Sequence, residues 1–226
     1  DRHSGQRLPI YQHRGEYWVA GRPGASYAVD VSNRSSGRIL AVLSVDGVNA
    51  ITGRAASATP DDGYVLGPWQ HSAITGWRKS DRQVAAFYFS DSDASYASRT
   101  GRPRDVGVIG VALFRERLPE PAPPVLRRSP AQEERAEAAA AASAASNKSA
   151  SPRTPSLGTG HGAMEPSHTR TVDFASASQR PAQTVRIRYD SYANLVAKGV
   201  IRVPRTEPER SPNPFPASGY VPDPPP

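Results

Sequence analysis

Residues 33–53 read NRSSGRILAVLSVDGVNAITG, and this stretch decides the fold. An apolar run over Ile39–Val45 is followed by Asp46-Gly47 and then by a second apolar run over Val48–Ile51. Asp-Gly between apolar runs is a strong hairpin signal, because a type I′ turn needs φ > 0 at both central residues. Both alternating faces of the first run begin apolar, which is typical of a strand buried on two sides. The stretch therefore predicts a central β-hairpin.

Short apolar or alternating runs recur on both sides of this hairpin, and Gly, Pro and Asp turns separate them. The additional strands predicted before residue 118 are Leu8–Tyr11, Tyr17–Ala20, Tyr27–Val31, Tyr64–Leu66, Ala73–Trp77, Val84–Ser90 and Val106–Phe114. No amphipathic helix separates them, which disfavours a βαβ arrangement. The pattern predicts an all-β fold, an antiparallel β-sandwich with jelly-roll-like topology.

The composition changes after this region. Of 226 residues, 37% are hydrophobic and 23 are proline, and the apolar residues concentrate before Phe114. This predicts a β-sandwich domain over residues 1–118, a partly helical Pro/Ala/Ser-rich linker over 119–156, a C-terminal segment over 157–203, and a Pro-rich extended tail over 204–226. An alanine-only apolar face, as in Ala131–Ala145, gives an isolated helix little stability in water.

The C-terminal segment carries its own local signals. Gly158–Gly162 predicts a tight loop, Val172–Phe174 a possible strand, and Thr184–Tyr189 a strand with Val185, Ile187 and Tyr189 facing inward. Ser191 is a predicted N-cap and Gly199 a predicted C′ stop for a helix over Tyr192–Lys198. The segment is too small to fold alone, so we expect it to dock on the β domain by adding a strand at an exposed edge.

The formal net charge is +7, and it comes almost wholly from arginine, because the chain has only three lysines. Arginine binds phosphate and carboxylate groups, but no clustered basic run occurs, which favours arginines scattered over a solvated surface. The absence of cysteine excludes disulfides, thiolate nucleophiles and cysteine-ligated metals. The sequence starts at Asp1, which fits either a mature exported chain or a shortened one. The longest apolar run, Val106–Phe114, is too short to span a bilayer as a helix.

Four blocks carry a resemblance: YVLGPWQHSAITGWRKSDRQVAAFYF at 64–89, SYASRTGRPRDVGVIGVALF at 95–114, LGTGHG at 157–162 and YDSYANLVAKGVI at 189–201. Together they resemble a family of exported proteobacterial proteins of unknown function. The resemblance covers the β domain and the C-terminal segment and skips the linker. It implies a bacterial protein of the periplasm, the cell surface or the exterior, and it brings no activity, cofactor or catalytic residue.

A metal site is one hypothesis for the chemistry. His161, Glu165 and His168 combine imidazole and carboxylate, which suits zinc. Gly160, Gly162 and Pro166 exclude the rigid HExxH helix, however, and a Gly-rich turn with a capping histidine is favoured.

Other catalytic patterns are weaker still. Asp91–Ser95 begins like an EF-hand loop, but Tyr96 and Arg102 replace the required Gly and Glu, and ordinary turn acids are favoured over a looser calcium site with Asp61, Asp62 or Asp105. Asp46 and Asp105 would be paired carboxylates only if the fold brought them together, and the turn already explains Asp46. No G-x-S-x-G elbow is present.

A binding surface is the most tenable positive hypothesis. Trp69, Trp77, Arg78 and Lys79 lie within a short span that combines aromatic rings with cations and would suit a sugar, a base or a protein partner. Burial of both tryptophans in the core is the competing interpretation.

The resulting hypothesis is a non-catalytic structural or protein-interaction module of an exported assembly. Phe215 and Tyr220 would anchor an extended C-terminal arm, either on the chain's own surface or on a neighbouring subunit by arm exchange. One alternative is a carbohydrate- or polyanion-binding module that uses Trp69, Trp77 and Arg78. Another is a metal-dependent hydrolase centred on His161. We predict no cofactor and find no specific nucleic-acid signal.

Overall fold

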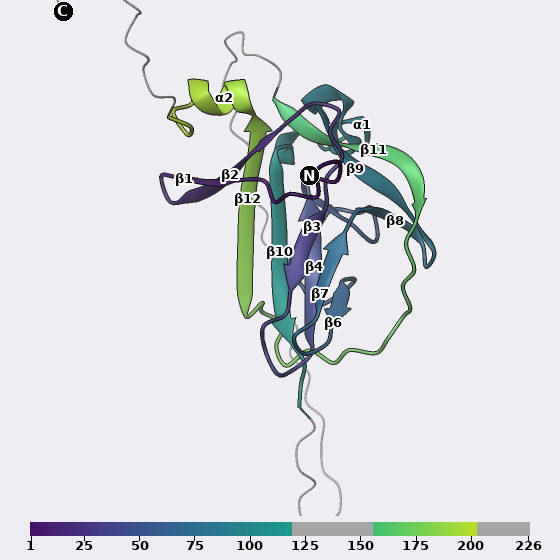
Figure 1. Ribbon diagram of the computed structural model, residues 1–226. Coiled ribbons are helices and arrows are strands. Elements are labelled where there is room, and N and C mark those ends of the chain that lie inside the picture. The colour runs from purple at the N-terminus through teal and green to yellow at the C-terminus, as the bar shows by residue number, and fades with distance from the viewer. Residues whose placement is uncertain (119–155, 203–226) are drawn as a thin grey trace, which may run out of the picture.

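The computed structural model describes residues 1–118 and 156–202, and these residues form mostly β-strands with few helices (Figure 1). The all-β prediction is confirmed at this level, while the jelly-roll-like order stays a prediction. The strands are β1 Ile10–His13, β2 Glu16–Gly21, β3 Val29–Ser32, β4 Ile39–Val45, β5 Val48–Asn49, β6 Tyr64–Leu66, β7 His71–Ile74, β8 Gly76–Ser80, β9 Gln83–Asp91, β10 Val108–Arg115, β11 Leu157–Pro166 and β12 Gln183–Ser191. The short helices are η1 Ser92–Ala94, α1 Tyr96–Arg99, η2 Pro103–Asp105 and α2 Tyr192–Ala197.

Three sheets surround the core. The largest has seven strands in the order β1-β2-β12-β10-β4-β5, and β6 also pairs with β4. The others have the orders β11-β9-β8 and β3-β7. The main core cluster takes side chains from all three sheets, among them Leu43, Ile74 and Phe87.

The predicted central hairpin is confirmed. Asp46 and Gly47 have φ values of 51° and 73°, and Val45 pairs with Val48 across a two-residue loop. Burial of β4 on two faces is also confirmed. One face contributes Leu43 to the main core, and the other contributes to a second cluster, whose buried members are Leu40, Val42, Ala112 and Phe114.

The expectation that the C-terminal segment adds its predicted strand at an exposed edge is wrong for β12. This strand lies inside the seven-stranded sheet, antiparallel to β10 and parallel to β2. The prediction of purely antiparallel pairing is therefore wrong, because β12 runs parallel to β2. The alternation was read correctly, since Val185, Ile187 and Tyr189 are covered more than Arg186 and Arg188. Because β12 pairs with β10 on one side and with β2 on the other, the C-terminal segment completes the sheet.

The prediction of a tight loop over Gly158–Gly162 is wrong, because these residues belong to β11, which pairs with β9. The glycines serve close approach and not a turn. A Cβ on Gly160 would lie 2.2 Å from the Tyr88 ring, and one on Gly162 would lie 2.7 Å from the Ala86 carbonyl oxygen. Glycine in a strand commonly marks such a contact.

Two local predictions have different outcomes. The single strand expected over Ala73–Trp77 is wrong: β7 and β8 divide it at Thr75 and belong to different sheets. The capping of α2 is confirmed, since the Ser191 hydroxyl accepts a hydrogen bond from the Asn194 amide at 3.2 Å and Gly199 has a φ of 71°. Leu195 of this helix packs with Val200 and Ile201 in a third apolar cluster.

Candidate functional site

The candidate site is bordered by residues 167–174, here called the strap, which run from the end of β11 toward β12. Figure 1 shows the strap as the green segment that arcs beside β8 and β6 to the lower end of the molecule. The predicted strand over Val172–Phe174 is wrong, because these residues form no ladder. The strap is instead held at its two ends by arginine side chains, by backbone hydrogen bonds and by an apolar contact.

The upper end of the strap is fixed to the β8–β9 turn. The Arg78 guanidinium donates to the Ser167 carbonyl oxygen at 2.7 Å and to the Ser167 hydroxyl at 3.0 Å. The amides of Ser167 and Thr169 donate to the carbonyl oxygens of Arg82 and Asp81, each at 2.8 Å. The Arg78 side chain therefore fixes the upper end of the strap to β8.

The lower end of the strap is fixed to the sheet. The Arg38 guanidinium donates to the Asp173 carbonyl oxygen at 2.7 Å, pairs with Glu116 at 3.0 Å, and lies 5.9 Å from the Phe174 ring centre. Phe174 packs on the outer cluster around Phe114. The packing of Phe174 and the hydrogen bond from Arg38 to Asp173 therefore both hold the lower end of the strap.

Between its two anchors the strap and the sheet enclose a cleft of about 1060 Å³, here called the strap cleft. This volume lies slightly above the usual range of small-ligand sites, which extends to about 1000 Å³. Its walls come from β6, the loop before β6, the strap, and the ends of β4 and β8. The residues that line the strap cleft include Asp61, Asp62, Tyr64, Val65, Leu66, Asp81, Arg170, Thr171, Val172 and Asp173.

Strand β6 forms one wall of the strap cleft, with Tyr64 and Val65 half-buried and Leu66 buried. The Leu66 carbonyl oxygen accepts a hydrogen bond from the Asn33 side-chain amide at 3.3 Å. Strand β6 pairs with β4 along one edge, and among the described residues its other edge joins no ladder. All three of its residues line the cleft. On the opposite wall, no backbone hydrogen bond of the described chain involves residues 170–172. An unpaired strand edge is a template for an incoming strand.

Acidic side chains line much of the strap cleft. The carboxylates of Asp62, Asp81 and Asp173 enter no ion pair among the described residues, and Asp61 accepts a hydrogen bond from the Thr59 hydroxyl. The arginines of the wall are Arg38, Arg78 and Arg170, and the first two hold the strap. Four aspartates thus line the cleft against three arginines, and Arg38 among these pairs with Glu116, so the wall carries a small excess of negative charge in a chain whose net charge is +7.

The structure separates the aromatic and basic residues that the sequence placed together. Trp77 is only 3% exposed, and its indole N–H donates to the Gly160 carbonyl oxygen at 3.0 Å. Trp69 is 71% exposed in the β6–β7 turn. Arg78 lines the strap cleft, while Lys79 is exposed beyond it and lies near His161. Phe215 and Tyr220 lie outside the described residues.

The three candidate metal ligands are not brought together. His161 stacks on Tyr96 with ring centres 5.6 Å apart, and Glu165 pairs with Arg2 at 2.8 Å. His168 lines the strap cleft. Over residues 1–118 and 156–202, no group of three His, Asp or Glu side chains is placed to hold a metal ion. Burial lowers the pKa of His161, and the nearby Lys79 and Arg99 cations lower it further.

The role of Asp46 extends well beyond its turn. Its carboxylate is fully buried and accepts hydrogen bonds from the Gly107 amide at 2.9 Å, the Thr159 amide at 2.7 Å and the Tyr189 hydroxyl at 2.6 Å. The Thr159 hydroxyl lies 2.7 Å from both the Tyr189 and the Tyr27 hydroxyls. Each hydroxyl has one proton, so the chain of donors runs from Tyr27 through Thr159 and Tyr189 to Asp46.

This network joins segments that are far apart in the sequence, and it is closed to solvent. Burial raises the pKa of Asp46, while the hydrogen bonds that it accepts oppose this shift. Burial likewise raises the pKa of Tyr189. We assign the network to stability and not to ligand contact. The Asp-Gly signal alone could not reveal it, because its donors come from β11, β12 and the residue before β10.

Comparison of the chain with protein-family models, with curated proteins and with solved structures yields no match in any of the three. Within the part of the chain that the structure describes, no helix has the length and apolarity needed to cross a membrane.

Proposed function

We propose that this protein is a non-catalytic protein-interaction module that binds an extended, basic segment of a partner protein in the strap cleft. The observation that carries the proposal is the edge of β6 that joins no ladder among the described residues, in a cleft bordered on its far side by the strap. A peptide that adds to a strand edge gains main-chain hydrogen bonds, and pockets for alternate side chains give selectivity. Residues 170–172 offer a second unpaired backbone on the other side.

Charge favours a basic segment. Asp62, Asp81 and Asp173 line the cleft from three different parts of the chain, and with Asp61 they outnumber the three arginines of the wall, of which Arg38 is paired with Glu116. Lysine or arginine side chains of a bound peptide would meet these carboxylates. Complementary charge of this kind contributes mainly to selectivity and association rate. Export of the protein, which rests on the sequence resemblance, remains part of the proposal.

The test starts from a display library of random 12-residue peptides selected on the full-length chain. Enriched peptides should carry lysine and arginine, and a fluorescein-labelled example should bind with a Kd of about 1–100 μM by anisotropy. Asp62→Asn combined with Asp81→Asn should weaken this binding about tenfold or more, since each lost charge contact contributes on the order of 1 kcal/mol. Asp93→Asn, an exposed carboxylate in η1, is the matched control and should change nothing.

Because the chain has no cysteine, a single introduced thiol can block the cleft selectively. Thr171→Cys labelled with a bulky maleimide should abolish peptide binding, and the same label on Asp93→Cys should not. Failure to enrich any peptide on the full-length chain, or enriched peptides that still bind the blocked Thr171→Cys chain, would contradict the proposal.

A further inference from the structure

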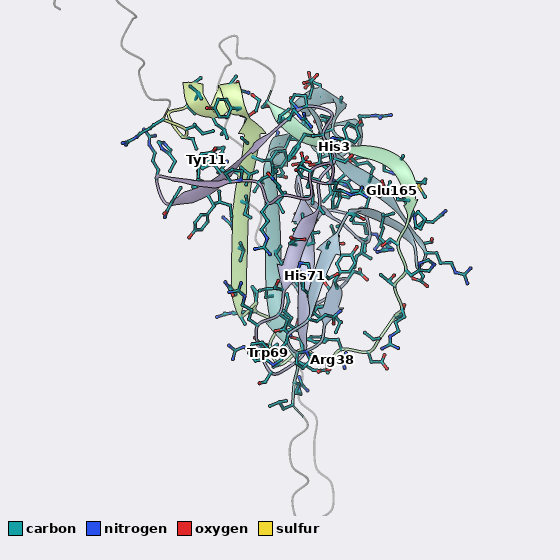
Figure 2. The ribbon with its side chains drawn as sticks, viewed as in Figure 1. His3, Tyr11, Arg38, Trp69, His71 and Glu165 are labelled. Carbon is teal, nitrogen blue, oxygen red and sulfur yellow. The ribbon has the colours of Figure 1, made fainter. Side chains whose placement is uncertain are left out.

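Four loops gather at one end of the molecule, here called the arginine end: residues 33–38, 67–70, 115–118 and 174–182. The strand registers place them together, because Ile39 pairs with both Arg115 and Leu66, and Glu116 bridges to Ser176. The Asn33 amide also donates to the Gln70 carbonyl oxygen at 2.8 Å. Figure 2 shows Trp69 and Arg38 at this lower end.

Trp69 is held in an unusual position at the arginine end. It follows Pro68 in a four-residue turn closed by the Gln70 amide and the Gly67 carbonyl oxygen at 3.2 Å, and its φ is 58°. Glycine is the usual residue at this place in such a turn, and a bulky side chain there is strained. The indole nevertheless stays 71% exposed, and it is not among the residues that line the strap cleft. Strain that presents an apolar side chain to solvent suggests a binding role.

The charges around Trp69 are nearly all positive. The four loops contain five arginines and a single acidic residue, Glu116, which already pairs with Arg38. Arg34, Arg117 and Arg180 are exposed and enter no ion pair among the described residues. Leu118, which is 80% exposed, adds a second apolar side chain.

We infer that the arginine end binds the surface of a bilayer that contains anionic lipids, with the Trp69 indole entering the headgroup region. Tryptophan favours this region because its ring is amphipathic, and arginines near an anionic surface strengthen the attachment. Single apolar side chains on loops, separated by cations, fit a fluid interface better than a rigid pocket. A soluble polyanion without bases or apolar groups, such as heparin, would use the arginines but would gain nothing from Trp69 and Leu118.

The three tryptophans of the chain make the test direct. Trp77 is buried, Trp18 is partly covered, and Trp69 is exposed, so a blue shift of the emission on binding reports on Trp69. The full-length chain is titrated with vesicles of phosphatidylcholine and phosphatidylglycerol at 3:1, and with phosphatidylcholine alone. We expect binding and a blue shift with the mixed vesicles, weakening as salt rises, and neither with phosphatidylcholine.

Variants separate the contributions. Trp69→Ser should lower the partition coefficient about tenfold, since a tryptophan offers a large contact area, and Arg34→Gln or Arg180→Gln about fivefold each. Trp69→Phe should keep most of the binding but lose the blue shift. Ile10→Ser, at an exposed position on β1, is the control and should bind as the unchanged chain does.

Equal vesicle binding by the unchanged chain and Trp69→Ser would overturn the inference. Retention on heparin without binding to the mixed vesicles would also overturn it and would assign the arginines to a soluble polyanion. Neither result depends on the strap cleft, because its peptide is absent from these assays.

Discussion

Replacement of Asp46 by Asn should destabilise the protein although it removes a buried charge. Asn tolerates the positive φ of 51° at this position, so the backbone is undisturbed. Its single carbonyl oxygen can keep the two bonds that Oδ1 now accepts, from the Gly107 amide and the Tyr189 hydroxyl. The amide nitrogen then faces the Thr159 amide, which lies 2.7 Å from Oδ2, and two donors meet.

The expected loss follows from that count. One charge-assisted hydrogen bond is lost and one buried N–H is left without an acceptor, which together should lower the free energy of unfolding by about 2–3 kcal/mol. Asp46→Ala removes the acceptor for all three donors, for a loss of about 3–5 kcal/mol, and its positive φ adds about 1 kcal/mol. Asp93→Asn, on the surface, should stay within about 0.5 kcal/mol of the unchanged chain.

Urea titration followed by tryptophan fluorescence measures these differences, and its pH dependence tests the electrostatics. Because burial raises the pKa of Asp46 in the folded state, its contribution to stability is complete below its unfolded-state pKa and is lost as the pH rises through the folded-state pKa. The difference in free energy of unfolding between the unchanged chain and Asp46→Asn should therefore narrow as the pH rises from the unfolded-state pKa of Asp46 through its folded-state pKa. A loss below about 0.5 kcal/mol for Asp46→Asn would refute the assigned network.

Three more expectations follow. A chain ending at Leu118 lacks β11 and β12 and should show no cooperative urea transition, so a sharp transition would speak against the central place of β12. Trp69→Gly should raise the free energy of unfolding by about 0.5–1 kcal/mol through relief of the positive φ, and a lower urea midpoint would argue against strain there. Burial raises the pKa of Asp190, but hydrogen bonds from Asn194 and Lys198 outweigh burial and hold that pKa below its ordinary value. The resulting stability is present above the unfolded-state pKa and is lost as the pH falls through the folded-state pKa. Lys198→Met should therefore weaken the loss of stability in acid, and an unchanged acid-unfolding profile would contradict the pairing of Lys198 with Asp190.

The features predicted correctly from sequence are those that neighbouring residues determine. The Asp46-Gly47 turn follows from the φ values that these two residues tolerate, and the limits of α2 follow from Ser191 and Gly199. The two-sided burial of β4 follows from its apolar composition. In each case the physical cause lies within a few residues of the feature.

The features that were missed depend on partners distant in the sequence. The glycines of β11 look like a turn in the sequence because the groups that require them, such as the Tyr88 ring against Gly160, lie on other segments of the chain. The alternating pattern of β12 shows which side chains face inward, but it does not show that the strand pairs with β2 and β10. The strap cleft depends on the bonds from Arg78 to Ser167, 89 positions away, and no local pattern encodes that pairing.

The most direct test of the proposed function is amide hydrogen exchange of the full-length chain with and without a basic peptide selected on it. Addition of a strand in the strap cleft predicts slower exchange at residues 64–66 and 170–172, with no change in β1 or α2. Peptide binding that leaves both segments exchanging at their original rates would contradict the proposal.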